Sequence, residues 1–453
     1  MSAKPRVPKP LPKRRKQSVQ VDSSYTADQA TIAAQEPTDH EAAKPELSEN
    51  DIQGLKYFAM IAPLLKRLHD EGCKRDKAKN RDLHFDQHCM LVLLYLFNPT
   101  ITSLRALQQA SGLENVKKKL GCARASLGSL SEASRVFDSH RLKEIIAELG
   151  EQGQSIRGQF DFGKVNNKTI TLVDGSLVSA MPNIIGASLL KASEGSALVK
   201  WRLHTHFEVD RYIPTRIDVT PDGGGENDER SVMEQTIKGD RLYVMDRGYA
   251  KFGLFNKIVD AKSSYACRIR DNSVYKVIDD RELSPEAREA DVLSDQVVEL
   301  GSQANRSRGR PNHKVRLICV KCSPHTSRST YGGKSTSPSS DGILRIATNL
   351  LDVPAEIISL LYAQRWQIEI FFRFFKQFMG CNHLISQNQN GIEIQSYCAI
   401  IACLLINLWT GRKPTKRTFE MLSYYFIGLA SEHELVAHLD KLKTHDEARE
   451  KNQ

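Results

Sequence analysis

Four polar residues recur at helical spacing within one apolar segment of the chain. The segment 361–378 reads LYAQRWQIEIFFRFFKQF and contains Tyr362, Arg365, Glu369 and Lys376. It has neither proline nor glycine, and as a single helix it would hold these four side chains within an arc of roughly 60°. Bulky apolar residues fill most of the remaining circumference, so the helix is expected to be buried. Its polar stripe then either faces a site or forms an internal Arg365–Glu369 pair that only supports the fold, and both interpretations stay open from this segment alone.

Two further carboxylates follow apolar runs that have the composition of buried strands. Asp174 ends the run TITLV, and Asp246 ends the run RLYVM. Gly175 and Gly248 follow closely, so both aspartates are expected at strand ends where the chain turns. Two strand-end aspartates and the helical Glu369 can converge as an oxygen-rich site for Mg²⁺ or Mn²⁺.

These residues together resemble a known family. The set Asp174, Asp246 and Glu369, with the last inside the pattern Tyr-x2-Arg-x3-Glu-x6-Lys, is similar to the DDE transposases of bacterial insertion sequences. It resembles in particular the group marked by a Y-R-E-K signature, and the spacing here fits that signature with no departure. The resemblance covers roughly residues 165–410 and implies a ribonuclease-H-like catalytic domain.

The chemistry of phosphodiester cleavage suggests a role for each of these side chains. Two divalent ions, Mg²⁺ with Mn²⁺ as a substitute, activate the attacking oxygen and stabilise the leaving oxygen in such reactions. The three acids are the predicted catalytic residues and metal ligands, and no covalent protein nucleophile is required. Arg365 and Lys376 can hold phosphate oxygens, while Tyr362 can stack on a base or donate to a phosphate. These three are the predicted DNA-binding residues.

Composition narrows the class of protein and its partners. The formal net charge of +10 favours a polyanionic partner. The nine cysteines are scattered and odd in number, which suits a reducing cytoplasm. No signal peptide is visible, and the longest apolar run, 397–408, is too short to span a bilayer and is expected to be a buried helix. These features predict a cytoplasmic protein without a membrane partner, and the family resemblance implies a bacterial protein that associates with the nucleoid when bound to DNA.

The pattern along the chain divides it into four regions. Residues 1–50 are predicted to be a disordered tail, basic and then acidic, and residues 51–155 to be helical. Within the helical region, Gly112 separates two helical pieces, of which the second is basic. This arrangement is compatible with a DNA-binding helix-turn-helix and equally with a helical bundle that carries an exposed lysine cluster. The family resemblance favours recognition of terminal repeats by the whole region.

From about residue 165 the apolar period changes to two. Three strands, a helix, a strand, a helix and a strand are predicted in that order, which indicates an α/β class (α+β overall). Together with the family resemblance, this order implies a ribonuclease-H-like mixed sheet flanked by helices. The predicted catalytic domain covers 165–412, with a β-rich insertion at about 272–342 that is either a surface embellishment or a DNA contact. Residues 413–453 are predicted to form C-terminal helices.

The predicted function is a transposase that binds the terminal repeats of its insertion sequence and catalyses cut-and-paste transposition of double-stranded DNA as a DNA-bound homodimer. One alternative is a stand-alone metal-dependent DNA nuclease with the same three acids. Another is a catalytically silent DNA-binding protein descended from a transposase. The presence of all three acids and the whole Tyr-Arg-Glu-Lys set argues against the silent descendant.

Overall fold

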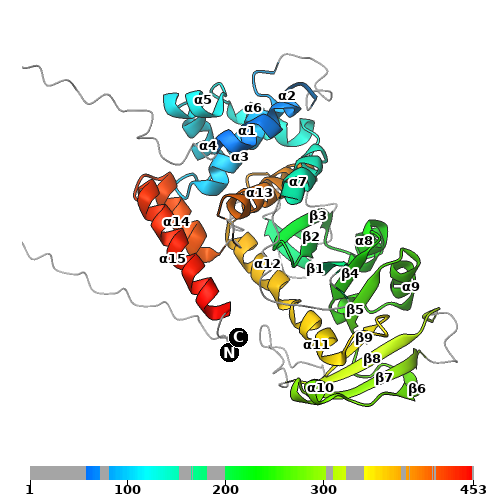
Figure 1. Ribbon diagram of the computed structural model, residues 1–453. Helices are drawn as coiled ribbons and strands as arrows, with labels where there is room; N and C mark the ends of the chain where they lie inside the picture. Colours follow the sequence, from blue (N-terminus) through cyan, green and yellow to red (C-terminus); the bar gives the residue numbers. More distant parts are fainter. Residues whose placement is uncertain are drawn as a thin grey trace, which may run out of the picture. The chain divides into compact units, whose positions relative to one another are not determined.

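The computed structural model of the chain is shown in Figure 1. It describes residues 58–71, 81–152, 165, 167–180, 199–301, 310–322, 341–378, 384–386, 388–410, 412 and 415–450. These residues all belong to one unit, Glu49–Gln453. The tail predicted over residues 1–50 lies outside them.

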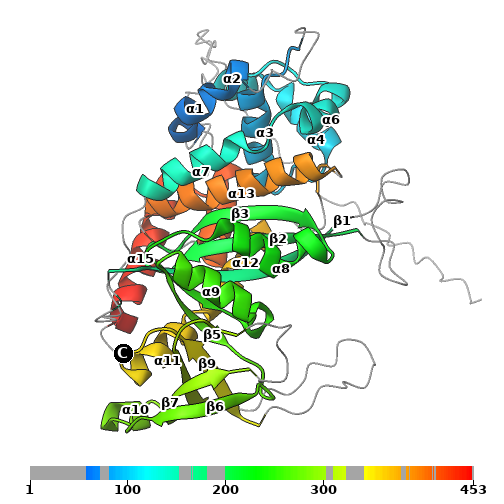
Figure 2. The ribbon, with the colours of Figure 1, turned by 90° about the vertical axis from the view of Figure 1, so that its right-hand side faces the viewer.

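A mixed sheet forms the centre of the described chain (Figure 2). Its strands are β1 (Thr169–Ala180), β2 (Val199–Glu208), β3 (Ile213–Pro221), β4 (Arg241–Met245), β5 (Ser264–Arg268), β6 (Tyr275–Asp280), β7 (Val292–Leu300), β8 (Val315–Lys321) and β9 (Ile343–Thr348). They lie in the order β3-β2-β1-β4-β5-β9-β8-β7-β6. The pairs β1–β4 and β4–β5 are parallel and the others are antiparallel. The predicted α/β fold with a mixed sheet is confirmed.

Helices precede, flank and follow this sheet. Those before it are α1 (Phe58–Lys66), α2 (Leu68–Glu71), α3 (Phe85–Phe97), α4 (Leu104–Ser111), α5 (Glu114–Leu120), α6 (Leu127–Val136) and α7 (Arg141–Gln152). Those after β3 are α8 (Glu229–Thr236), α9 (Phe252–Asp260), α10 (Pro285–Glu289), α11 (Ala355–Ala363), α12 (Trp366–Phe378), α13 (Gln389–Thr410), α14 (Lys416–Phe426) and α15 (Glu432–Glu450). Short 3₁₀ helices η6 (Gly225–Asn227) and η7 (Arg247–Tyr249) precede α8 and α9.

The alternation of side chains along β1 separates two hydrophobic cores. Ile170 and Leu172 belong to the core that also contains the apolar residues of α11, α12 and α13. Val173 belongs to the core formed with α8 and α9. Because successive strand residues point to opposite faces, Asp174 lies on the α12 side of the sheet with Leu172.

The prediction that the chain turns just after Asp174 is wrong. β1 continues through Gly175 to Ala180, because antiparallel pairing with β2 supplies a partner for its whole second half. Only the parallel pairing with β4 stops near the aspartate, at the pair Val173–Met245. Asp174 is therefore a mid-strand residue, whereas Asp246 does follow the last residue of β4.

The segment predicted as one helix around Glu369 forms two. α11 ends at Ala363 and α12 begins at Trp366, with i→i−3 bonds from Arg365 to Tyr362 and from Ile368 to Arg365 at the junction. The expected burial is also incomplete, since Trp366 is 49% exposed and Ile370 is 42% exposed. The outward face of α12 is thus partly apolar and open to solvent.

The β-rich insertion extends the central sheet. Strands β6, β7 and β8 and helix α10 come from residues 272–342, and β8 pairs with β9, which pairs with β5 of the core. The described residues of this region thus contain three strands and one short helix, and its status as an insertion stays a prediction. Residues 302–309 and 323–340 lie outside the described residues, including the first four residues of the basic patch predicted at 306–314.

Helix α13 is longer than the apolar run that predicted it. Within the described residues it is the one helix whose length and composition would suffice to cross a membrane, and 94% of its apolar window is buried in the protein. It contacts α3, α6, α7 and β3. The prediction of a buried helix is confirmed, and α13 joins the N-terminal helices to the sheet.

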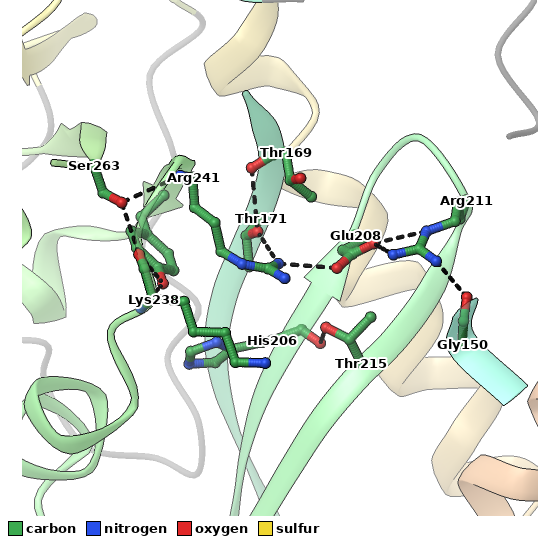
Figure 3. A network of polar contacts seen from close by, with 11 residues as sticks. Gly150, Thr169, Thr171, His206, Glu208, Arg211, Thr215, Lys238, Arg241 and Ser263 are labelled. Atoms are coloured by element: carbon green, nitrogen blue, oxygen red, sulfur yellow. Dashed lines mark hydrogen bonds and ion pairs between the residues drawn. The ribbon is translucent and has the colours of Figure 1, made fainter. Parts of the chain in front are cut away.

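A buried polar network also links the N-terminal helices to the sheet (Figure 3). Glu208 of β2 is 1% exposed and accepts hydrogen bonds from Arg241 and Arg211, each at 2.9 Å. Arg241 also donates to the Thr171 hydroxyl of β1 at 3.0 Å, and Arg211 donates to the carbonyl of Gly150 in α7. One carboxylate therefore ties β1, β2, β4 and α7 together.

Candidate active site

Asp174 and Asp246 lie side by side at the centre of the sheet. Their strands, β1 and β4, are parallel neighbours, and the last paired residues, Val173 and Met245, directly precede the two aspartates. Residues at matching positions of adjacent strands have backbones about 5 Å apart. Leu172 and Val244 share one core, so the alternation of the strands directs both carboxylates to the α12 side.

Glu369 reaches the same place from helix α12. It lies in the first turn of the helix, which contacts β1. Its Oε1 is 2.6 Å from Nη2 of Arg365, and the other terminal nitrogen of that guanidinium, Nη1, is 3.8 Å from Oδ2 of Asp174. Arg365 therefore bridges a carboxylate on the helix and a carboxylate on the sheet.

The electrostatics of Asp174 reflect this crowding. Burial raises its pKa from 3.8 to about 7, and the Asp246 and Glu229 carboxylates add to the rise. The Gly175 N–H, which donates to Oδ1 of Asp174 at 2.8 Å, and the charge of Arg365 act in the opposite direction. Opposite Asp174 on β2, the hydroxyl of Thr205 is fully buried and bonds to no described residue. The site thus offers several carboxylate oxygens and a hydroxyl that bonds to no described residue, next to one guanidinium. Oxygen ligands of this kind suit a hard divalent cation.

Tyr362 belongs to this cluster, and Lys376 lies further away. Tyr362 is in the last turn of α11 and is buried, and burial raises the pKa of its phenol, which also feels the charges of Arg365 and Asp246. The pKa of Arg365 lies above its ordinary value. Burial acts to lower it, but the neighbouring Tyr362, Glu369 and Asp246 raise it by more. Lys376 is in the last turn of α12, seven residues after Glu369, which is about 10 Å along the helix axis.

A fourth acid, Glu229, lies behind the aspartates, and no local sequence pattern indicated it. It is the first residue of α8, and its carboxylate occupies the space where a Cβ on Gly175 would lie. Arg202 pairs with Glu229 and, at 2.7 Å, with Asp222. Gly175 therefore permits a close approach of α8 to β1, where the sequence analysis expected a turn.

A second unexpected residue is Tyr249, in the segment DRGY that follows β4. It is 1% exposed, its hydroxyl bonds to no described residue, and burial raises its pKa, with contributions from the Glu229 and Asp174 charges. In the sequence, the feature that could have indicated Tyr249 is its position three residues after Asp246 in a short turn.

Comparison with known proteins identifies the family. The family described as Transposase DDE domain matches residues 166–405. The chain is 26% identical over 281 residues to the putative transposase y4zB of Sinorhizobium fredii, covering 62% of this chain and 72% of that protein. It is 27% identical over 224 residues to the probable transposase for insertion sequence element IS5377 of Geobacillus stearothermophilus, covering 49% of this chain and 52% of that protein.

A solved structure also aligns with the chain. It is the cryo-EM structure of the piggyBac transposase synaptic complex with hairpin DNA, with 10% identity, a TM-score of 0.37 and coverage of 87% of this chain and 83% of that one. The family match alone spans more than half of the chain, and transposase domains of this family act on DNA with divalent metal ions. The chain therefore belongs to the DDE transposases of insertion sequences, which are enzymes that act on DNA.

Proposed function

We propose that this transposase binds the terminal repeats of its insertion sequence and moves the element by cut-and-paste transposition. The observation that carries this proposal is the arrangement of the three acids. Asp174 and Asp246 directly follow the last paired residues of two parallel strands, and Arg365 joins Asp174 to Glu369. Water would attack the phosphodiester at each end of the element, and the freed 3′-hydroxyl would then attack the target DNA.

The three acids are the proposed ligands of Mg²⁺, with Mn²⁺ as a substitute. Ions bound there would activate the attacking oxygen and stabilise the charge on the leaving oxygen. Asp174 is partly buried and its carboxylate is repelled by that of Asp246, which supports this assignment, because a divalent cation relieves both the repulsion and the cost of burial. The side chain of Arg365 holds Glu369 in place for this purpose.

The remaining residues of the stripe are proposed to bind the transposon end. The guanidinium of Arg365 and the ammonium of Lys376 can each donate to phosphate oxygens. Arg365 lies at the α11–α12 junction and Lys376 in the last turn of α12, and this separation suits contacts with different phosphates of one strand. The hydroxyl of Tyr362 would donate to a phosphate near Asp246.

The N-terminal helices are proposed to recognise the terminal repeats. Ser103 caps α4, and the chain passes through Gly112 into α5, whose Lys118 is exposed. A short helix, a tight connection and a basic second helix suit DNA docking. We further propose that the protein acts as a DNA-bound homodimer in the bacterial cytoplasm, because cut-and-paste transposition handles two ends together.

The test uses DNA that carries both ends of the element, Mg²⁺ and a plasmid target. Wild type is compared with Asp174→Asn, Asp246→Asn and Glu369→Gln, with cleavage at the ends and joining to the plasmid as separate readouts. We expect wild type to cleave and join, and each variant to bind the ends without cleaving. Cleavage without joining would replace the proposal with a nuclease, and binding without cleavage in wild type would replace it with a silent DNA-binding descendant.

A further inference from the structure

The loop between β9 and α11 is held by two arginines of the insertion. Arg316 of β8 donates through Nη1 to the carbonyl of Leu350 at 3.1 Å and to that of Val353. Arg281, just after β6, donates through Nη1 to the carbonyl of Leu351 at 2.5 Å. Carbonyls along this short loop therefore accept hydrogen bonds from side chains that begin more than thirty residues earlier in the chain.

Arg316 is itself fixed by a buried ion pair. Its Nε and Nη2 each lie 2.6 Å from an oxygen of Asp295 on β7, and the two side chains are 3% and 6% exposed. This is the bidentate geometry that orients a guanidinium most firmly. The main-chain N–H of Arg281 also donates to the carbonyl of Asp295 at 2.9 Å. Asp295 thus holds both arginines, one through its side chain and one through its backbone.

The same loop is tied to the catalytic sheet on its other side. The hydroxyl of Thr348 donates to the carbonyl of Tyr265 in β5 at 2.6 Å, and Asn349 accepts from the Tyr265 N–H at 3.0 Å. Helix α11, which starts where the loop ends, contacts β5, β7 and β8. Its last turn carries Tyr362, and the tight junction to α12 carries Arg365.

We propose that Arg281 and Arg316 are positioning residues for the active site. By holding loop 350–353 they fix the start of α11, and through the α11–α12 junction they fix Arg365 and Glu369 against Asp174. The inference rests on the proposed function of these acids. The β-rich insertion then serves catalysis from inside the protein, beyond either the surface embellishment or the DNA contact that its sequence suggested.

Arg281→Met is the main test, because Arg281 is only partly buried and its loss leaves the Asp295–Arg316 pair intact. Arg288→Met, at an exposed position of α10 in the same insertion, is the matched control. The expected result is faster hydrogen exchange across 355–378 and roughly tenfold slower single-turnover cleavage, since small misplacement of a catalytic group is costly. Binding of the transposon end and the melting temperature should match those of the control.

Arg316→Lys is the second variant, since lysine keeps a charge beside Asp295 but lacks the fork that also reaches the loop. We expect the same changes in exchange and cleavage. Should this variant fail to fold, Arg281→Met decides alone. The proposal would be overturned if every folded variant showed the same hydrogen-exchange rates across 355–378 and the same cleavage rate as Arg288→Met. Wild-type protein that cleaves no DNA would overturn the proposed function, while the exchange measurement would still decide whether the arginines hold α11 and α12.

Discussion

At the scale of single residues, Arg365 links the helical and the strand-borne parts of the site. It lies where two helices meet, and its guanidinium contacts Glu369 on one side and approaches Asp174 on the other. A side chain in such a place does two things. It offsets the repulsion between the acids, and it fixes the direction of the glutamate. Lysine could supply the charge but not both contacts at once.

Arg365→Gln should therefore impair the chemistry more than DNA binding. We expect single-turnover cleavage to fall roughly 100-fold, as for loss of one preorganised donor in a site of this kind. Binding of the transposon end should weaken only a few-fold, because one phosphate contact among many is lost. Arg373→Gln, at an exposed position of the same helix, is the control and should leave cleavage unchanged. Equal effects of the two substitutions would contradict the role given to Arg365.

The same scale explains what the sequence could and could not predict about the site. The acids and their neighbours were predictable, because an aspartate after a buried strand and a spaced helical stripe are local patterns. Glu229 was not, because its approach depends on Gly175 lacking a side chain and on α8 crossing a strand over fifty residues away. A glycine in a sequence indicates either a turn or a close approach, and only the packing decides between them.

At the scale of elements, helix α3 shows how burial changes a titratable group. His88 is buried beside Phe137, and desolvation lowers its pKa from 6.5 to about 4. Burial similarly lowers the pKa of His204 to about 4 and that of His206 to about 3 on β2. Between pH 6.5 and 4 the unfolded chain binds protons at these imidazoles that the folded chain does not. Stability is therefore lost as the pH falls through this window.

His88→Leu should flatten this dependence. Between pH 6.5 and 4, protonation of His88 in the unfolded chain is expected to lower the wild-type free energy of unfolding by up to about 3 kcal/mol. The variant lacks this contribution, so its free energy of unfolding should fall by correspondingly less. Urea unfolding at several pH values measures the slope. His140→Leu, at an exposed position, is the control and should keep the wild-type slope. An unchanged slope in His88→Leu would show that this imidazole titrates normally in the folded protein.

Some features of the helices and strands could be predicted from the sequence, and two could not. The strands, the order of the core elements and the buried α13 followed from apolar periods of two and from long apolar runs. The break between α11 and α12 did not, because no proline or glycine marks it; the chain there forms tight i→i−3 bonds that the tertiary packing selects. The continuation of β1 past Asp174 depends likewise on β2, a partner over twenty residues away along the chain.

At the scale of the whole molecule, packed elements connect the N-terminal helices, the sheet and the β-rich insertion. Helix α13 and the Glu208 network join the N-terminal helices to the sheet, and the insertion arginines join the far strands to the helices that carry Arg365 and Glu369. A DNA end bound by the N-terminal helices would thus be held relative to the acids by packed elements. The net charge of +10 suits an enzyme that acts on DNA.

The central claim is that Asp174, Asp246 and Glu369 form one metal centre. Its most direct test is to measure Mn²⁺ binding to the DNA-free protein by electron paramagnetic resonance. Asp174→Asn, Asp246→Asn and Glu369→Gln are compared with wild type and with Glu234→Gln, whose carboxylate pairs with Lys251 and Lys257 away from the site. If the three acids form one metal centre, wild type and Glu234→Gln bind Mn²⁺ alike, and each of the three site variants loses affinity. Undiminished Mn²⁺ binding in all three variants would contradict the account.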